Sequence, residues 1–273
     1  MRRPLASFAV NAALLLVAAL TVAPLAWMVS ASLMPTGEAT SLPPRLLPSS
    51  VTLEHYRTLF TRLHLARCLL NSLGLATAVT LFSVLLNSMA GYGFARFRFR
   101  GSDLLFRLLA AGLVIPAQVA MLPLFLELKK LGLVNSYVGV VIPGMASIFG
   151  IFLVRQYALT MPQSLLDAAR TDGAGELRIY RSLVLVLCAP ILVTLAVFTF
   201  LGTWNDFMWP LIVLADDRLY TLPVALANLA GEHVQDTELM MAGAVITIVP
   251  VALLFLALQR YYIAGIAAGA VKE

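Results

Sequence analysis

The chain has 273 residues, of which 60% are hydrophobic and 12% are charged, and its formal net charge is +5 at pH 7. Soluble domains carry about 25% charged residues, so this composition excludes an ordinary soluble domain and indicates a protein of the lipid bilayer. The positive charge is explained by membrane topology, which places basic residues on one side. We therefore expect no nucleic-acid partner.

Six long stretches of the chain contain no Asp, Glu, Lys or Arg. Each can hold the roughly 20 apolar residues that a helix needs to cross the hydrocarbon core. A β-barrel would instead alternate polar and apolar residues over segments of about 10 residues. The sequence therefore predicts an all-α membrane protein with six transmembrane helices, one in each of the windows 4–37, 68–95, 108–126, 131–154, 182–205 and 239–259.

The first window follows Arg2 and Arg3, a pattern also seen in secretory signal peptides. Its apolar run from Leu5 to Val29 exceeds the roughly 7–15 residues of a signal-peptide core. We expect an uncleaved N-terminal span at about 5–33. The remaining spans occupy about 69–263, and residues 1–273 are expected to form a single transmembrane domain.

The basic residues are unevenly distributed between the connecting segments. With the N-terminus inside, twelve of the 19 Lys and Arg fall in inner segments, and Lys and Arg favour the cytoplasmic side. Both termini are therefore expected in the cytoplasm. The same reasoning places residues 95–106 and 155–181 in the cytoplasm, and residues 34–67, 127–130 and 206–238 outside.

The first outer segment contains a short helical pattern. Leu53, Tyr56, Leu59 and Phe60 recur at helical spacing. We expect a short amphipathic helix that lies at the outer surface of the membrane.

The second window contains polar residues, among them Asn87 and Ser88. Polar and small residues within a span usually face neighbouring helices, so packing is the ordinary explanation. The alternative is that these two side chains line a substrate path.

Proline recurs in four of the later windows. It removes one backbone hydrogen bond and can kink a membrane helix. Kinks in four spans favour a moving transporter over a static anchor, and the residues concerned are Pro116, Pro123, Pro143, Pro190 and Pro250.

Catalytic and metal-binding patterns are not evident in the sequence. No charged residue stands in the middle of a window, which argues against an ion-coupled transporter and against an intramembrane hydrolase. Cys68 and Cys188 form no metal motif, and no histidine pair has ligand spacing. We expect neither catalytic residues nor a metal site, and only packing or solvated roles for His55, His64 and His233.

A charged segment, residues 161–173, lies between the fourth and fifth windows. Thr160 as N-cap with Pro162 in the first turn predicts a helix start. Gly173 predicts its end, because glycine adopts the left-handed conformation at low cost. A second short helix at about 175–181 leads into the fifth span. We therefore expect a helix–turn–helix elbow over residues 161–182 on the cytoplasmic side.

Small residues occupy the centre of this elbow. Ala168 and Ala169 permit a close approach of backbones, and the flanking Asp167 and Arg170 could fix the register through ion pairs to a partner. Physical reasoning alone leaves two interpretations open: docking into a partner, or packing against the underside of the same chain.

The segment Asp167-Ala168-Ala169-Arg170-Thr171-Asp172-Gly173-Ala174, followed later by Leu187-Cys188-Ala189-Pro190, resembles the Glu-Ala-Ala loop of the membrane subunits of ATP-binding-cassette importers. Aspartate stands where that family has glutamate, so the charge is kept and one methylene is lost. The resemblance implies that the elbow couples to an ATPase through Asp167, Ala168, Ala169, Arg170, Asp172 and Gly173.

Other segments resemble carbohydrate-importer permeases, in particular the second permease of the maltose-importer type. They are residues 95–101, 200–210, 219–223 and 259–272. Trp204 and Asn205, in the second of these, are candidates for a substrate path together with Asn87 and Ser88. An interfacial aromatic belt is the alternative for Trp204.

The resemblance implies the fold of a type I ABC importer permease in a bacterial or archaeal inner membrane. It also implies four kinds of partner: a second homologous permease, an ATPase dimer, an extracytoplasmic solute-binding protein and the bilayer. ATP and Mg would be bound by the ATPase subunits, so the chain itself would hold no cofactor and would not be an enzyme. A P-loop lysine follows a glycine, and none of Lys129, Lys130 and Lys272 does so.

The predicted function is half of the translocation path for a sugar or oligosaccharide, working by alternating access. A permease for a glycerol-phosphate-type sugar phosphate, a polyamine or an amino acid is the alternative within transport. A membrane enzyme or an anchor is the alternative outside it.

Overall fold

The computed structural model describes residues 3–43, 45–61, 64–232 and 236–270, and this part of the chain contains helices and no strand. The predicted all-α membrane fold is therefore confirmed. Within the described residues, the helices long and apolar enough to cross a membrane are Val10–Ala31, Leu65–Arg96, Tyr137–Leu159 and Thr237–Ala257. Two bent helix pairs raise the number of spans to as many as six.

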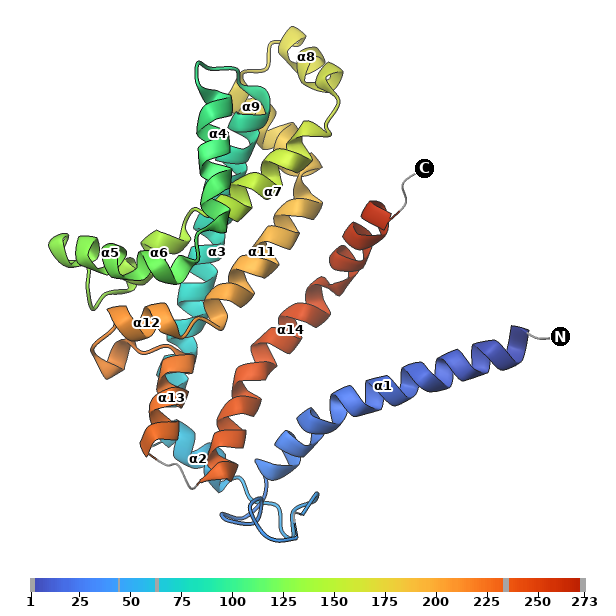
Figure 1. The fold of residues 1–273 in the computed structure, drawn as a ribbon, viewed down its shortest axis with the longest axis vertical. Helices are drawn as coiled ribbons and strands as arrows, with labels where there is room; N and C mark the ends of the chain where they lie inside the picture. Colours follow the sequence, from blue (N-terminus) through green and yellow to red (C-terminus); the bar gives the residue numbers. More distant parts are fainter. Residues whose placement is uncertain (1–2, 44, 62–63, 233–235, 271–273) are drawn as a thin grey trace. The chain divides into compact units, whose positions relative to one another are not determined.

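The chain divides into two compact units. The first comprises residues 1–66 and 225–253, and the second comprises residues 67–224 and 254–273. Figure 1 gives the element labels, and each unit is described separately. The helices α13 (Leu222–Glu232) and α14 (Thr237–Ala270) each contribute to both units.

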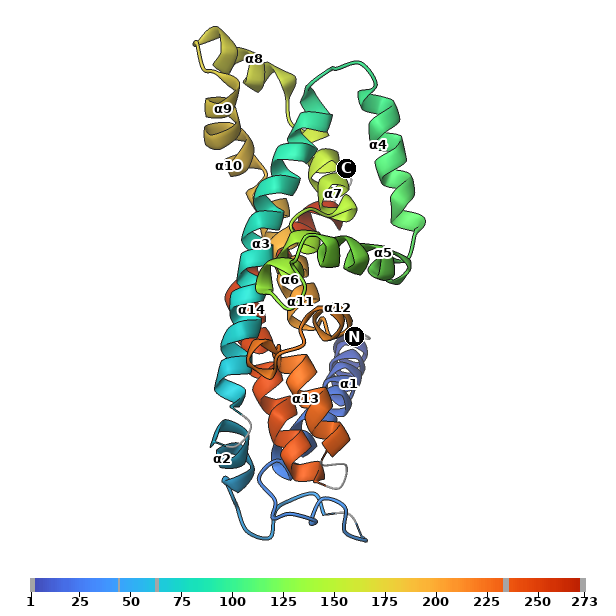
Figure 2. The same cartoon turned by 90° about the vertical axis from the view of Figure 1, so that its left-hand side faces the viewer.

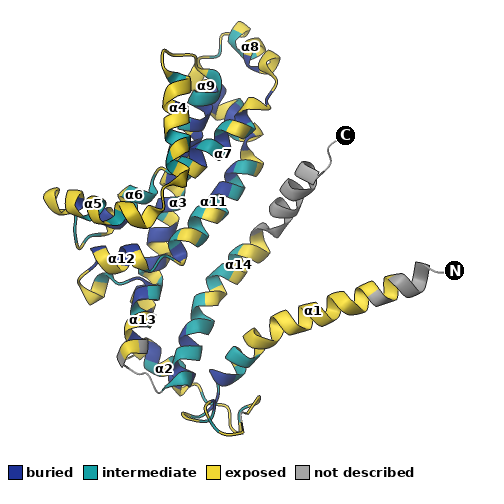
Figure 3. Cartoon of the chain, viewed as in Figure 1, coloured by how far each residue is buried: buried dark blue, intermediate teal, exposed yellow. Residues whose placement is uncertain are grey.

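The first unit begins with α1 (Arg3–Ala31), whose surface is almost entirely uncovered. Its apolar 18-residue window has 0% of its residues buried, and Figure 3 shows α1 exposed along most of its length. An apolar helix left uncovered by its own chain needs lipid or another apolar surface around it. This is the behaviour expected of a membrane span.

The segment that follows α1 in the first unit is held by buried polar groups. The buried Glu238 accepts a hydrogen bond from the Ala39 N–H at 2.7 Å. The buried His55, on α2 (Glu54–Thr61), donates from Nε2 to the Met34 carbonyl oxygen at 2.8 Å. The predicted short helix is therefore present, and His55 has a packing role rather than a solvated one. His233 lies outside the described residues.

The second unit is organised around α3 (Leu65–Arg96), which runs along its length (Figure 2). The helix α7 (Ile148–Leu159) approaches α3 closely at Gly91, where an added Cβ would lie 2.7 Å from the Val154 Cβ. The helices α4 (Ser102–Ala111) and α11 (Ala189–Trp204) both pack against α7. These helices form the frame that carries the elbow.

Two of the six predicted windows are not straight helices. The third breaks between η1 (Gly112–Val114) and α5 (Ala117–Lys130), with a bend of 107°. Pro116 lacks an N–H and pushes Ile115 to extended dihedrals, which ends the first helix. The fifth bends by 77° just before Pro190.

The remaining short elements are α6 (Tyr137–Gly144), α8 (Gln163–Thr171), α9 (Glu176–Ile179), the π-turn η2 (Tyr180–Val184), α10 (Leu185–Leu187), α12 (Met208–Val213) and η3 (Asp217–Leu219).

Candidate functional site

The predicted elbow is present as α8 and α9, at the end of the second unit where α3 terminates (Figures 1 and 2). The turn between the two helices has a defined geometry. Gly173 has a φ of 80°, its N–H donates to the Arg170 carbonyl, and the Ala174 N–H donates to the Ala169 carbonyl, both at 3.0 Å. These two bonds make a Schellman motif, which satisfies carbonyls that the helix end would leave unpaired. The prediction of Gly173 as the left-handed stop is confirmed.

The predicted start of this helix is wrong in one detail. Thr160 does not cap α8 but ends α7, and its hydroxyl donates to the Tyr157 carbonyl at 2.7 Å. Pro162 stands at the N-cap of α8, and no side chain caps this end. The Thr160 hydroxyl bonds to a backbone carbonyl one turn earlier instead of capping an N–H of α8. Threonine forms local bonds of this kind readily.

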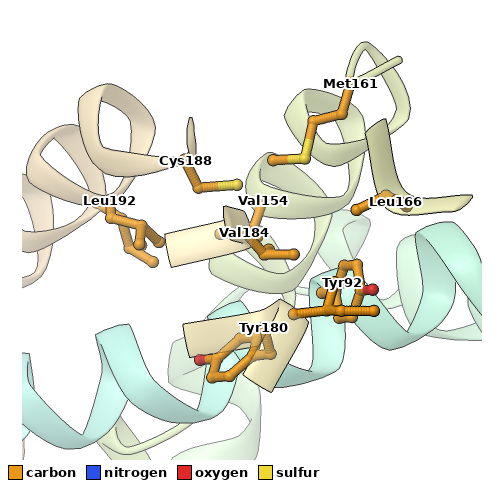
Figure 4. Packing of buried hydrophobic residues seen from close by; sticks show 10 residues of the cluster. Tyr92, Val154, Met161, Leu166, Tyr180, Val184, Cys188 and Leu192 are labelled. Atoms are coloured by element: carbon orange, nitrogen blue, oxygen red, sulfur yellow. The ribbon is translucent and has the colours of Figure 1, made fainter. Parts of the chain in front are cut away.

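The elbow stands on an apolar base. Leu166 is fully buried on α8, and Ile179 is buried on α9. Figure 4 shows Leu166, Val184 and Tyr92 converging between the elbow and α3. Burial of a leucine side chain contributes about 1.5–3 kcal/mol, so this cluster fixes the underside of α8.

The opposite side of α8 is exposed. Leu165, Ala168 and Asp172 are exposed and follow one another at helical spacing, and Ala169 beside them is half-buried. A cavity of about 240 Å³ adjoins this face, and its lining residues are Ala169, Asp172, Ala174, Arg178, Ile179, Ser182 and Leu183. The exposed face therefore has a small side chain, Ala168, at its centre and a polar one, Asp172, at its end. Another backbone can approach such a surface closely.

Three charged residues of the elbow pair with one another. Arg170 contacts Asp167 and Glu176, each at 2.8 Å. These contacts raise the pKa of Arg170 above its usual value, and the hydrogen bond to Glu176 has the largest effect. The sequence suggests that Asp167 and Arg170 fix the register through ion pairs to a partner. Within the chain, Asp167 pairs with Arg170 along α8, and Arg170 braces α8 against Glu176 of α9. Ion pairs to a partner stay a prediction.

Two residues of α3 complete the site, and sequence reasoning missed both. Arg96 donates from Nη2 to the carbonyl oxygens of Ala158, at 2.6 Å, and Met161, and from Nη1 to Gln163 Oε1 at 2.9 Å. The Tyr92 hydroxyl donates to Glu176 at 3.4 Å. An arginine at the end of a span is ordinarily explained by membrane topology, so the sequence carried no separate signal for this contact.

The candidates for a substrate path in α3 are buried and hydrogen-bonded. Asn87 donates to Ser83 Oγ at 2.7 Å and accepts the Ser147 N–H at 2.9 Å. The Ser88 hydroxyl lies 2.6 Å from the Tyr180 hydroxyl. Both side chains therefore join α3 to neighbouring elements of the same unit.

The other two candidates lie at the end of α11. Trp204 is 1% exposed and stacks on Phe200 with 6.0 Å between ring centroids. Asn205 is exposed at the C-cap and donates to the Leu201 carbonyl at 2.8 Å. Trp204 therefore packs inside this chain rather than presenting its ring at a surface, and Asn205 alone of the four candidates has an exposed side chain.

The fold and the elbow define a class: a polytopic α-helical membrane protein with a small helical loop exposed beside one end of the span α3. Comparison with known families identifies the class more closely. The family described as "Binding-protein-dependent transport system inner membrane component" matches residues 72–267. The chain belongs to this family.

Individual relatives cover nearly the whole length of the chain. It is 37% identical over 272 residues to the arabinooligosaccharides transport system permease protein AraQ of Halalkalibacterium halodurans, with 98% of each chain covered. It is 30% identical over 263 residues to the diacetylchitobiose uptake system permease protein NgcG of Streptomyces coelicolor, which covers 95% of this chain and 87% of the relative.

A solved structure has the same fold. One chain of the crystal structure of a bacterial ABC transporter involved in the import of the acidic polysaccharide alginate matches with a TM-score of 0.83 and 25% sequence identity. The match covers 96% of this chain and 98% of the other. The fold is therefore that of an ABC importer permease of type I, and the chain is a transport subunit of the inner membrane.

Proposed function

We propose that this chain is the permease subunit of an ATP-driven importer for a sugar or oligosaccharide, and that residues 161–182 dock onto its ATPase. The observation that carries the docking proposal is the exposed face of α8, formed by Leu165, Ala168 and Asp172 over a buried base. The substrate class is supported by the similarity to AraQ and NgcG.

The proposed partners are a second homologous permease, an ATPase dimer and an extracytoplasmic solute-binding protein. In this proposal the ATPase subunits bind ATP and Mg. The sequence supports that division, because none of the three lysines follows a glycine as a P-loop lysine does. The uncovered apolar surface of α1 leaves room for contact with lipid or with the second permease.

In the proposed orientation, both termini and the elbow are cytoplasmic. The support is the excess of Lys and Arg in the segments assigned to the inner side. The acidic residues Asp216 and Asp217 would then lie outside, beyond the end of α11.

The proposed mechanism is alternating access driven through the elbow. The helix α9 continues through the π-turn Tyr180–Val184 and α10 toward α11. A displacement of the elbow by a closing ATPase dimer would therefore pass directly into the fifth span. Rigid-body motion of this kind is a common way to transmit a change at one site to a distant one.

A tryptophan on the exposed face tests the docking proposal. Ala168→Trp should lower co-purification of the ATPase subunit at least tenfold and abolish uptake, because bulk replaces the small centre of the face. Membrane insertion should stay normal, since the Ala168 side chain is exposed. Ala215→Trp is the matched control, as Ala215 is also exposed but lies in the segment assigned to the outside. Full ATPase binding and full uptake by Ala168→Trp would contradict the proposal.

A further inference from the structure

We propose that Arg96, assisted by Tyr92, is a positioning residue that holds the elbow in its docking geometry. This inference rests on the proposed function, and it concerns α3 rather than the docking face. The elbow itself is weakly self-supporting: α8 has nine residues, and isolated helices shorter than about 12–15 residues are marginal in water. Its position must therefore be fixed from outside.

Arg96 contacts three consecutive parts of the chain. Its guanidinium binds the Ala158 carbonyl in the last turn of α7, the Met161 carbonyl in the link, and the Gln163 side chain at the start of α8. A cation is favoured at a helix C-terminus. The Ala158 carbonyl at the end of α7 accepts from Arg96 in addition to the Met161 N–H, which lies 3.3 Å away. The planar fork of arginine reaches several acceptors at once, which a lysine ammonium does less well.

From Gln163 the contacts continue through the elbow and return to α3. Gln163 Nε2 donates to Asp167 at 3.0 Å. Arg170 then joins Asp167 to Glu176, which accepts from the Tyr92 hydroxyl. Tyr92 and Arg96 are four residues apart, on one face of α3. The circuit is closed, so α8 and α9 cannot shift relative to α3 without breaking a contact in it.

The same helix is fixed within the bundle. Asn87 binds the backbone at the start of α7, and Ser88 binds Tyr180 in the π-turn. The contacts of Arg96 therefore connect the elbow to a helix that is itself bonded to the core of the unit. This makes α3 the element against which the elbow is oriented.

The test is a titration of the reconstituted transporter with its ATPase subunit, read out as binding-protein-stimulated ATP hydrolysis. Arg96→Met should raise the apparent Kd for the ATPase subunit at least tenfold, because the docking face is no longer held in place. The maximal rate at saturating ATPase subunit should stay within about twofold of the unmodified chain. Arg98→Met is the matched control: Arg98 is exposed two residues further on, and this variant should leave both parameters unchanged.

Arg96→Lys keeps the positive charge and provides a second variant if the methionine variant folds poorly. It should also raise the apparent Kd, because an ammonium does not reproduce the three contacts. A loss of maximal rate at unchanged Kd would overturn the inference, since that result reports a smaller folded fraction. Unchanged parameters in both variants would overturn it as well. If Ala168→Trp still abolished docking in either case, the proposed function would stand while the role of Arg96 failed.

Discussion

Asn87 shows how a single polar residue organises the buried part of the second unit. Its amide bridges the Ser83 hydroxyl on α3 and the Ser147 backbone N–H before α7. An added Cβ on Gly150 would lie 2.6 Å from Asn87 Nδ2, so the glycine makes room for this contact. A polar group at this depth is tolerated because its hydrogen-bonding groups have partners.

The substitution Asn87→Ala should lower the free energy of unfolding by about 1 kcal/mol, since it leaves a backbone donor unpaired and membrane hydrogen bonds contribute about 0.6–1.7 kcal/mol. Thermal or denaturant unfolding of the purified chain in detergent measures the change. Asn205→Ala is the control and should have a smaller effect, because Asn205 is exposed. Equal stability of the two variants would show that the Asn87 bridge contributes nothing.

Residue-level contacts across the fold are the least predictable from the sequence. Asn87 and Ser88 stand out as polar residues in a span, but the identity of their partners depends on elements about 60 and 90 residues further along the chain. The role of Arg96 is hidden for a similar reason. Its acceptors are mostly backbone carbonyls. Every residue type has a backbone carbonyl, so the sequence does not indicate which residues accept.

At the scale of elements, local signals predict the elbow well. Gly173 ends α8 as expected, and a second short helix follows. The predicted helix start is wrong, because Thr160 could cap either neighbouring helix and its hydroxyl closes the turn of α7. In the elbow, residue preferences therefore predict the turn at Gly173 correctly but not the residue that caps the start of α8.

Gly173 offers an element-scale test. Gly173→Val should weaken ATPase docking about fivefold to thirtyfold, because a left-handed conformation costs an L-residue about 1–2 kcal/mol. A Cβ added at Gly173 would have no atom within 4 Å, so backbone strain rather than a clash is the cause. Gly173→Asn is the control and should dock nearly normally, since asparagine tolerates this conformation. ATPase co-purification measures both, and equal losses would contradict the explanation.

The bends in the third and fifth spans can be anticipated only in part. Proline at 116 and 190 marks where backbone bonds are lost, but the bend angles of 107° and 77° depend on the elements that pack around each break. Proline elsewhere differs in its effect. Pro24, Pro123 and Pro250 lie inside continuous helices. Pro143 lies one residue before the end of α6. The local sequence therefore indicates where a helix can bend but does not determine the bend angle.

At the scale of the whole molecule, composition and charge-free windows predict the all-α membrane fold, because the bilayer imposes long apolar helices whatever their partners. The division into two compact units is not predicted. It depends on which segments pack together, and the first unit combines residues 1–66 with residues 225–253. Much of the apolar surface remains uncovered within this chain, as on α1, which fits a subunit that functions in lipid and in an assembly.

The central claim is that the elbow lies on the cytoplasmic side and is covered there by the ATPase. One measurement tests both parts: the labelling of Asp172→Cys and Asp217→Cys by a membrane-impermeant maleimide, in intact cells and in inside-out vesicles. Both positions are exposed in this chain.

In intact cells, Asp217→Cys should be labelled from outside and Asp172→Cys should not. In inside-out vesicles stripped of the ATPase, Asp172→Cys should be labelled, and added ATPase subunit should protect it. Labelling of Asp172→Cys in intact cells would contradict the orientation, and labelling that stays equal with and without the ATPase subunit would contradict the docking.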